Sequence, residues 1–382
     1  MQPPSQTEPN LEVPTLEAAG PEATESFADD LKPGTTLLNG QYTILGFLNS
    51  GGFGITYLAQ DSLDRKVVIK ECFPNALCRR KTLAVRPSSR KYADDLRSFV
   101  QTFIAEARNL AKLVHPNIVG VHQVFEDNDT AYMAIDFVDG KDLEDILSST
   151  DQAFTPAEIV VLLQKMLSAA DFIHQAGILH RDISPDNILI DRDGNPVLID
   201  FGAASQATLV PTRVLTGRRV VKDGYSPQEF YLTGAEQSPA SDLYSLGATF
   251  YHVITGAPPV ESQRRLARIA EGAPDPYQPL AGRYPAYPEG MLTSIDKALR
   301  VLQKDRLQSA SVWADLIFHP EADPSPAPAT TEARRPKTPA ARQFAQVGIL
   351  SRPVVADNMG YMIGAGIGFA VAALGGLWWL LR

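Results

Sequence analysis

The chain has 382 residues, enough for one large domain or two ordinary ones, and 44% of them are hydrophobic, which supports a sizeable core. Its formal net charge is −9 at pH 7. Because binding to nucleic-acid phosphates needs a basic field, this acidic balance argues against nucleic acid as a partner.

The N-terminal stretch differs in composition from the middle of the chain. Residues 1–33 hold seven acidic residues, six prolines and one lysine, without a sustained hydrophobic period. Such a segment buries too little apolar surface to offset the entropy lost on ordering. We therefore expect residues 1–40 to form a disordered, acidic, proline-rich terminus.

The next part of the chain is rich in β-prone runs separated by glycine or polar turns. These runs are residues 42–46, 55–59, 66–70, 118–124 and 131–137. Between the third and the fourth run, residues 95–113 carry apolar side chains at three- and four-residue spacing, which predicts a helix. His115-Pro116 ends that helix, because proline disfavours the α conformation in the residue before it.

After Gly140 the pattern becomes helical. Strong amphipathic periodicity predicts helices at residues 156–175, 242–255 and 291–302. The sequence thus predicts an α+β fold with a β-rich N-lobe at about residues 41–136 and a helical C-lobe at about residues 137–318.

The most informative segment is His180-Arg-Asp-Ile-Ser-Pro-Asp-Asn187, followed after a short β-prone run by Asp200-Phe-Gly202. A carboxylate such as Asp182 can orient a substrate hydroxyl and accept its proton as a phosphoryl group is transferred. Asn187 offers a neutral oxygen and Asp200 an anionic one, and both suit Mg²⁺. A divalent metal is needed because charge accumulates on phosphate oxygens.

A glycine-rich loop and a lysine precede this segment. The loop is Asn49-Ser-Gly51-Gly52-Phe53-Gly54, between two β-prone runs, where backbone N–H groups can approach phosphates without a Cβ in the way. Val67-Val-Ile-Lys70 ends the third run with a cation. Taken alone, either feature is weak, since glycine-rich hairpins and terminal strand lysines are common.

The order of these motifs resembles that of eukaryotic-type (Hanks-type) protein kinases. Further matching segments are Lys70-Glu-Cys-Phe-Pro, Gly224-Tyr-Ser-Pro-Gln-Glu229, Ser241-Asp242-Leu and Lys304-Asp-Arg306. The residues of these segments are most similar to those of bacterial serine/threonine kinases, and the resemblance covers about residues 41–318. It implies a two-lobed protein-kinase fold that transfers the γ-phosphate of ATP to Ser and Thr hydroxyls of protein substrates, with Mg²⁺ or Mn²⁺.

The resemblance also implies roles for particular residues. Lys70 would hold the α- and β-phosphates and pair with Glu106 on the helix 95–113. The residues expected to bind the nucleotide are Asn49, Gly51, Gly52, Gly54, Lys70, Asp136 and Val138. Those expected in catalysis are Asp182, Lys70, Glu106, Asn187 and Asp200, with Asn187 and Asp200 as the metal ligands. Glu229 and Arg306 are expected to form a structural ion pair.

Two positions depart from the family's pattern. Asn49 replaces the first glycine of the loop, although Asn tolerates left-handed backbone angles. Ser184 stands where serine/threonine kinases usually carry a lysine that reaches toward the γ-phosphate, and losing one well-placed charge can lower the rate on the order of 10²–10³-fold. A pseudokinase-like ATP-binding signalling scaffold at the membrane therefore stays open as the alternative to an active kinase.

The segment between Asp200 and Glu229 holds threonines and several cations. In similar kinases the residue at Arg181 grips a phosphate on this segment, which orders it. We expect autophosphorylation on Thr216, with Thr212 as the second candidate. The alternative is that both are ordinary loop threonines.

The C-terminal part predicts a membrane anchor. Residues 319–358 hold seven prolines and read as a Pro/Ala-rich juxtamembrane linker. Residues 359–381 carry no charge over 23 residues, long enough to span a hydrocarbon core of roughly 30 Å, although a buried core helix is the alternative. Basic residues are concentrated before this span, which predicts a single-pass protein of the inner (cytoplasmic) membrane with a cytoplasmic kinase domain. Small residues recur every fourth position, so a homodimer through this face is an open alternative to a lone helix.

Overall fold

The computed structural model describes residues 29–149, 154–201, 221–232 and 234–319. All of them belong to one compact unit, Met1–Ser325. Within the ranges described, no helix combines the length and the apolar character that a bilayer crossing requires. The predicted linker 319–358 lies outside these ranges apart from its first residue, and the predicted span 359–381 lies wholly outside them.

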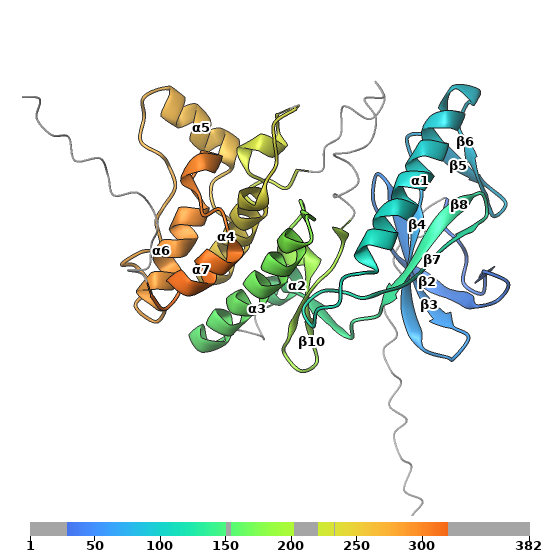
Figure 1. Ribbon diagram of the computed structural model, residues 1–382, viewed down its shortest axis with the longest axis horizontal. Coiled ribbons are helices and arrows are strands. Elements are labelled where there is room, and N and C mark those ends of the chain that lie inside the picture. Colours follow the sequence, from blue (N-terminus) through green and yellow to red (C-terminus); the bar gives the residue numbers. More distant parts are fainter. Residues whose placement is uncertain (1–28, 150–153, 202–220, 233, 320–382) are drawn as a thin grey trace, which may run out of the picture. The chain divides into compact units, whose positions relative to one another are not determined.

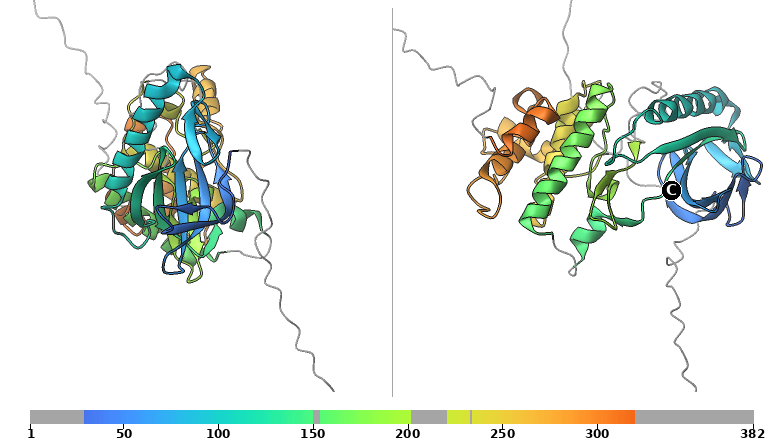
Figure 2. Two further views of the ribbon diagram at one scale, coloured as in Figure 1. Left: turned by 90° about the vertical axis from the view of Figure 1, so that its right-hand side faces the viewer. Right: turned by 60° about the horizontal axis from the view of Figure 1, so that its bottom comes forward.

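The N-lobe is built on a six-stranded antiparallel sheet with the order β1-β2-β3-β4-β8-β7. The strands are β1 Thr36–Leu37, β2 Tyr42–Ser50, β3 Gly54–Asp61, β4 Lys66–Cys72, β7 Val121–Asp127 and β8 Thr130–Asp136. The sheet curls, and helix α1 (Ala93–Leu110) lies along one side of it (Figures 1 and 2). A two-stranded hairpin, β5 (Cys78–Lys81) and β6 (Ala84–Pro87), precedes α1.

The N-lobe begins earlier in the chain than residue 41. Strand β1 pairs with β2, and Leu31 and Leu37 are buried in the core of the sheet. The backbone N–H of Leu31 donates to the Tyr57 hydroxyl at 3.1 Å. The boundary predicted at residue 40 is therefore too late, because two isolated leucines in a short irregular segment produce no period that a sequence pattern can reveal.

The C-lobe is mainly helical, with a small three-stranded sheet in the order β11-β10-β9. Its strands are β9 Gly140–Asp142, β10 Ile188–Asp191 and β11 Pro196–Leu198. Its helices are α2 Leu143–Ser148, α3 Pro156–Gln175, α4 Pro239–Thr255, α5 Ser262–Ala270, α6 Glu289–Ala298 and α7 Ala310–Leu316. Short 3-10 turns occur at Arg90–Tyr92, Pro185–Asn187, Gln228–Phe230 and Gln303–Asp305.

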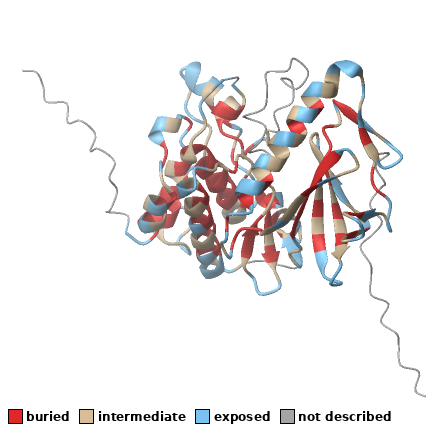
Figure 3. Cartoon of the chain, turned by 45° about the vertical axis from the view of Figure 1, so that its right-hand side comes forward, coloured by how far each residue is buried: buried red, intermediate tan, exposed pale blue. Residues whose placement is uncertain are grey.

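Helices α3 and α4 form the centre of this lobe. Thr155 and Glu158 make a reciprocal capping box at the start of α3, and Pro156 follows the cap, where its missing N–H costs nothing. Every residue of α4 from Ala240 to His252 is buried, which makes it the central helix of the core (Figure 3). Because α4 is buried, its side chains can contact the loops that surround it. At the site, Asp242 of α4 contacts the loop that carries His180 and Arg181.

Candidate active site

The loop between α3 and β10 is held in place by one buried carboxylate, that of Asp242 in the first turn of α4. The backbone N–H of His180 donates to Asp242 Oδ2 at 2.9 Å, and that of Arg181 donates to Oδ1 at 2.8 Å. His174 Nε2 lies 2.8 Å from Oδ2. Burial works against ionisation of Asp242, but these hydrogen bonds and the His174 ring hold its pKa below the ordinary value.

Two residues of the site adopt left-handed backbone angles that side chains other than glycine rarely take. They are Arg181, with φ 68°, and Asp200, with φ 61°. Such angles persist only where surrounding contacts over-determine the backbone, and they concentrate at functional sites. Asp242 supplies those contacts for Arg181. The His180 ring packs on the Phe201 ring at 4.6 Å between centroids, which ties the catalytic loop to the segment that carries Asp200.

Asp182 is the candidate base, and the structure holds it in place. The Asn187 amide Nδ2 donates to the Asp182 carbonyl at 2.7 Å and to its carboxylate Oδ2 at 3.0 Å. Burial raises the pKa of Asp182 to about 6, the neighbouring Asp200 and Asp186 carboxylates add to that, and Lys222 partly opposes it. A base with a pKa near 6 is ionised at neutral pH, yet still basic enough to accept a proton.

One cavity gathers most of the residues expected from the sequence. Its walls include the glycine-rich loop on one side and the catalytic and metal-binding candidates on the other. The predicted residues among its lining are Asn49, Gly51, Gly52, Gly54, Lys70, Glu106, Asp182, Asn187 and Asp200. Gly54 could not be replaced without strain, because a Cβ there would lie 2.6 Å from the Glu71 carbonyl oxygen.

The donor set at Asn187 and Asp200 fits a magnesium ion that arrives with phosphates. Asn187 commits its amide nitrogen to Asp182, which leaves its oxygen as a neutral ligand. The Asp200 side chain is 43% exposed and lines the cavity. Within the described ranges, no group of three or more His, Cys, Asp or Glu side chains is placed to hold a metal by itself. Mg²⁺ needs no such cage, since one or two protein oxygens and substrate phosphates commonly bind it.

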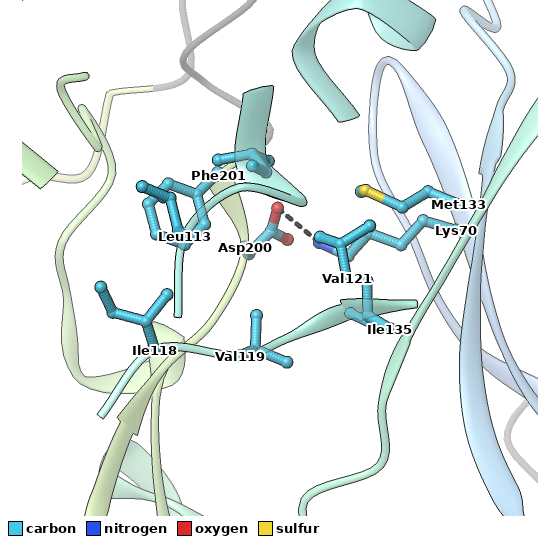
Figure 4. A pocket seen from close by; sticks show the side chains of 10 residues that line it. Lys70, Leu113, Ile118, Val119, Val121, Met133, Ile135, Asp200 and Phe201 are labelled. Carbon is cyan, nitrogen blue, oxygen red and sulfur yellow. Dashed lines mark ion pairs between the residues drawn. The ribbon is translucent and has the colours of Figure 1, made fainter. Parts of the chain in front are cut away.

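Lys70 makes an ion pair with Asp200, at 2.6 Å between Nζ and Oδ1 (Figure 4). The expected pairing of Lys70 with Glu106 stays a prediction, and both side chains line the same cavity. Asp200 reaches Lys70 across the edge of an apolar pocket that both residues line. Glu106 also lies within electrostatic reach of Arg181: burial lowers the pKa of that guanidinium, and the Asp242 and Glu106 carboxylates oppose the shift.

Asp136 and Val138, assigned to the nucleotide by resemblance, do not line this cavity. The Asp136 carboxylate accepts a hydrogen bond from the Gly120 N–H at 2.8 Å and pairs with His122 Nε2 at 2.5 Å. Val138 is half-buried and packs against the core of the C-lobe. Side chains engaged in this way leave only the backbone at these positions for a ligand.

Sequence reasoning missed the cation that lies beside the candidate base. Lys222 Nζ donates to Ser184 Oγ at 2.7 Å and to the Asp186 carboxylate at 2.9 and 2.7 Å. It also lies 3.4 Å from Asp182 Oδ1, and it lines the cavity. Burial opposes ionisation of Asp186, but the hydrogen bonds from Lys222 and Ser184 lower its pKa. Asp242 was recognised only as part of a matching segment, and its role was not predicted, because it depends on contacts with His180 and Arg181, about 60 residues earlier in the chain.

The structure pairs Glu229 with Arg306 in a two-point contact. Arg306 Nη1 donates to Glu229 Oε1 at 2.6 Å, and Nη2 donates to Oε2 at 3.0 Å. The two side chains are 6% and 0% exposed. Ser241 Oγ donates to Glu229 as well, and the guanidinium reaches the carbonyls of Arg300 and Val301. The predicted phosphorylation sites Thr212 and Thr216 lie outside the described residues.

Comparison with known proteins places this geometry in a family. The model of the protein kinase domain matches residues 42–315. The serine/threonine-protein kinase PrkC of Bacillus subtilis (strain 168) is 32% identical over 266 residues, 68% of this chain and 37% of that protein. The serine/threonine-protein kinase PknD of Mycobacterium tuberculosis is 32% identical over 64% of this chain and 35% of its own length.

A solved structure gives the same result in three dimensions. The PpkA-294 apo form is 35% identical in sequence and superposes with a TM-score of 0.64, covering 76% of this chain and all of that one. The chain spans only about a third of the length of PrkC and PknD. The match over residues 42–315, carrying the cavity, the catalytic loop and the buried ion pair described above, shows that the chain belongs to the protein kinase domain family.

Proposed function

We propose that this protein is an ATP-dependent serine/threonine protein kinase. The observation that carries the proposal is the cavity in which the glycine-rich loop, Lys70, Asp182, Asn187 and Asp200 meet. The names of the relatives, each a serine/threonine-protein kinase, support Ser and Thr as the acceptors. The same residues could serve a scaffold that binds ATP without transfer, and the experiment below separates the two.

The chain's own residues account for the reaction as follows. Asp182, ionised at neutral pH, accepts the proton of a substrate Ser or Thr hydroxyl. The hydroxyl oxygen bonds to the γ-phosphorus, the bond from that phosphorus to the β–γ bridging oxygen breaks, and ADP leaves with the electron pair. The glycine-rich loop and Lys70 hold the phosphates of ATP. Lys70 must exchange its contact with Asp200 for the phosphates as the nucleotide binds.

Asn187 and Asp200 would hold Mg²⁺ or Mn²⁺ against the phosphates of ATP. The metal would neutralise charge that develops on the β- and γ-phosphate oxygens during transfer. Asp200 could serve as its ligand once Lys70 has moved to the phosphates, because the Asp200 carboxylate is partly exposed and faces the cavity.

The test uses the full chain, γ-³²P-labelled ATP, Mg²⁺ and dephosphorylated casein. We expect label on casein, on the chain itself, or on both, and loss of about 10³-fold in rate for Asp182→Asn, in line with removal of a general base. Transfer that persists unchanged in Asp182→Asn would reject the assignment of the base. Saturable ATP binding without any transfer would favour the scaffold.

Autophosphorylation of the activation segment is the second part of the proposal. Arg181 is half-buried beside Asp182, and its guanidinium lies within electrostatic reach of two carboxylates. A phosphate on Thr216, or on Thr212, would supply a third anionic partner for it. Phosphopeptide mapping after reaction with ATP should find one of these two residues. Sites confined to residues 1–28 would reject this part.

A membrane anchor is the third part. The uncharged sequence 359–381 and the basic residues before it support a single inner-membrane span with the kinase domain in the cytoplasm. Small residues every fourth position support association of two spans. Fractionation of cells expressing the full chain or a chain ending at residue 358 tests the anchor, which is rejected if both partition alike. Crosslinking with Gly364→Leu and Gly368→Leu tests the homodimer.

A further inference from the structure

Ser184 and Lys222 come from two segments 38 residues apart and meet through one hydrogen bond of 2.7 Å. Ser184 is fully buried, and its hydroxyl in turn donates to Asp186 at 2.7 Å. A serine brings no charge to the catalytic loop, so the loop itself holds two carboxylates and no lysine. The charge that faces these carboxylates comes from Lys222, which lies in the activation segment between Asp200 and Glu229.

Hydrogen bonds of the Lys222 backbone fix the turn on which its side chain is carried. Its N–H donates to Ser226 Oγ at 2.8 Å, and its carbonyl accepts from the N–H groups of Tyr225 and Ser226 at 3.0 and 2.9 Å. Ser226 is in turn fixed from α5, since the Ser262 hydroxyl donates to its carbonyl at 2.8 Å. Gly224 closes the turn with a φ of 86°, and a Cβ there would lie 2.9 Å from Pro258. A cation on such a turn is held in place before any substrate arrives, which is what electrostatic stabilisation of a transition state requires.

The surroundings of Lys222 are those of a site residue and not of a remote structural pair. Its side chain is 25% exposed and lines the same cavity as Asp182, Asn187 and Asp200. The ammonium group has three protons to donate, and its contacts are with Ser184, Asp186 and Asp182. Asp182 Oδ1 lies 3.4 Å from the Lys222 ammonium group, so the cation lies directly beside the base.

We propose that Lys222 supplies the positive charge that Ser184 cannot, beside the γ-phosphate of ATP and next to the base Asp182. This inference rests on the proposed kinase function. Lys222 keeps the catalytic loop in position through Ser184 and Asp186, and its ammonium group stabilises the charge on the phosphoryl group as it is transferred. The cation beside the base thus comes from the activation segment, whereas Lys70, the other lysine of the cavity, comes from β4.

The first experiment compares Lys222→Met and Lys222→Arg in the full chain, with γ-labelled ATP and casein. Lys165→Met is the matched control, because Lys165 is also half-buried and donates to one polar group, Asn195, outside the cavity. We expect kcat to fall about 10²-fold in Lys222→Met, to stay within about tenfold of wild type in Lys222→Arg, and to be unaffected in Lys165→Met. A kcat of Lys222→Met within threefold of wild type, or equal losses in Met and Arg, overturns the proposal. Lys222→Gln replaces the Met variant if that one does not fold.

A binding measurement tests the contact of Lys222 with the γ-phosphate even if no phosphate is transferred. Calorimetry compares the affinities of AMP-PNP and ADP, which differ in the γ-phosphoryl group, for wild type and Lys222→Met. We expect the preference for AMP-PNP to fall about tenfold in the variant, as loss of one charge-assisted hydrogen bond predicts. An unchanged preference overturns the role of Lys222. Transfer absent from a wild type that binds both nucleotides rejects the kinase activity alone.

Discussion

Two cation–carboxylate clusters in the C-lobe use similar groups for opposite purposes. Arg306 and Glu229 are almost fully buried and hold each other at two points. Lys222 faces Asp182 and Asp186 with a quarter of its side chain exposed, at the wall of a cavity. In the first cluster the two charged groups are hydrogen-bonded to each other at both ends. In the second, Asp182 lies 3.4 Å from Lys222 and is still able to accept a proton from a substrate. The difference shows that burial and completeness of pairing, more than the presence of an ion pair, separate a structural site from a chemical one.

The largest expected effect comes from breaking the buried pair. Arg306→Met leaves the Glu229 carboxylate buried with only the Ser241 hydroxyl as a side-chain donor among its described contacts. Removing one partner of a buried pair destabilises by about 3–5 kcal/mol. Urea unfolding of the full chain should therefore show a loss of that size.

The double variant Glu229→Met/Arg306→Met sharpens this test. With no charge left behind, it should be destabilised less than the sum of the two single variants, since similar hydrophobic replacements of whole buried pairs are often tolerated. Simple additivity would mean that the pair is not coupled, and the comparison with the Lys222 cluster would then fail.

The next effect has the opposite sign. Burial raises the pKa of Asp182 to about 6, so its ionised form is less stable in the folded chain than in the unfolded one. Asp182→Asn removes this cost and should stabilise the fold on the order of 1–3 kcal/mol at pH 7, although it slows transfer about 10³-fold. Thermal unfolding of variant and wild type at pH 7 measures it. A destabilised variant would show that Asp182 has a structural role like that of Glu229.

The dependence on pH follows from the same group. A carboxyl whose folded pKa is raised contributes stability that is fully present below the unfolded value of 3.8 and is lost as the pH rises through about 6. Activity runs the other way, because only ionised Asp182 accepts a proton. We expect kcat to fall about tenfold per pH unit below pH 6, which is about 1.4 kcal/mol per unit. A profile that is flat from pH 7 to pH 5 would contradict the assigned base.

The sequence predicts the helices and strands of this fold better than it predicts which side chains pair with each other. The motif order locates Asp182, Asn187 and Asp200 because their roles are tied to short segments, and the cavity brings them together. The ion pair of Lys70 with Asp200 was not predicted, because it joins a strand of the N-lobe to a loop 130 residues further along the chain. The contact of Lys222 with Ser184 leaves no local signal, because it depends on how two loops 38 residues apart are folded against each other.

The smallest expected effect on stability is that of breaking the partly exposed cluster around Lys222. Lys222→Met removes contacts to Asp186, whose side chain is 51% exposed, and to Asp182, which Asn187 also holds. Partly exposed pairs contribute about 0–1 kcal/mol, so urea unfolding of this variant should lie close to that of wild type and of Lys165→Met. The activity of the same variant should nevertheless fall, as argued above. If instead the fold loses as much as in Arg306→Met, Lys222 belongs with the buried structural pairs, and the charge beside the γ-phosphate must come from another residue.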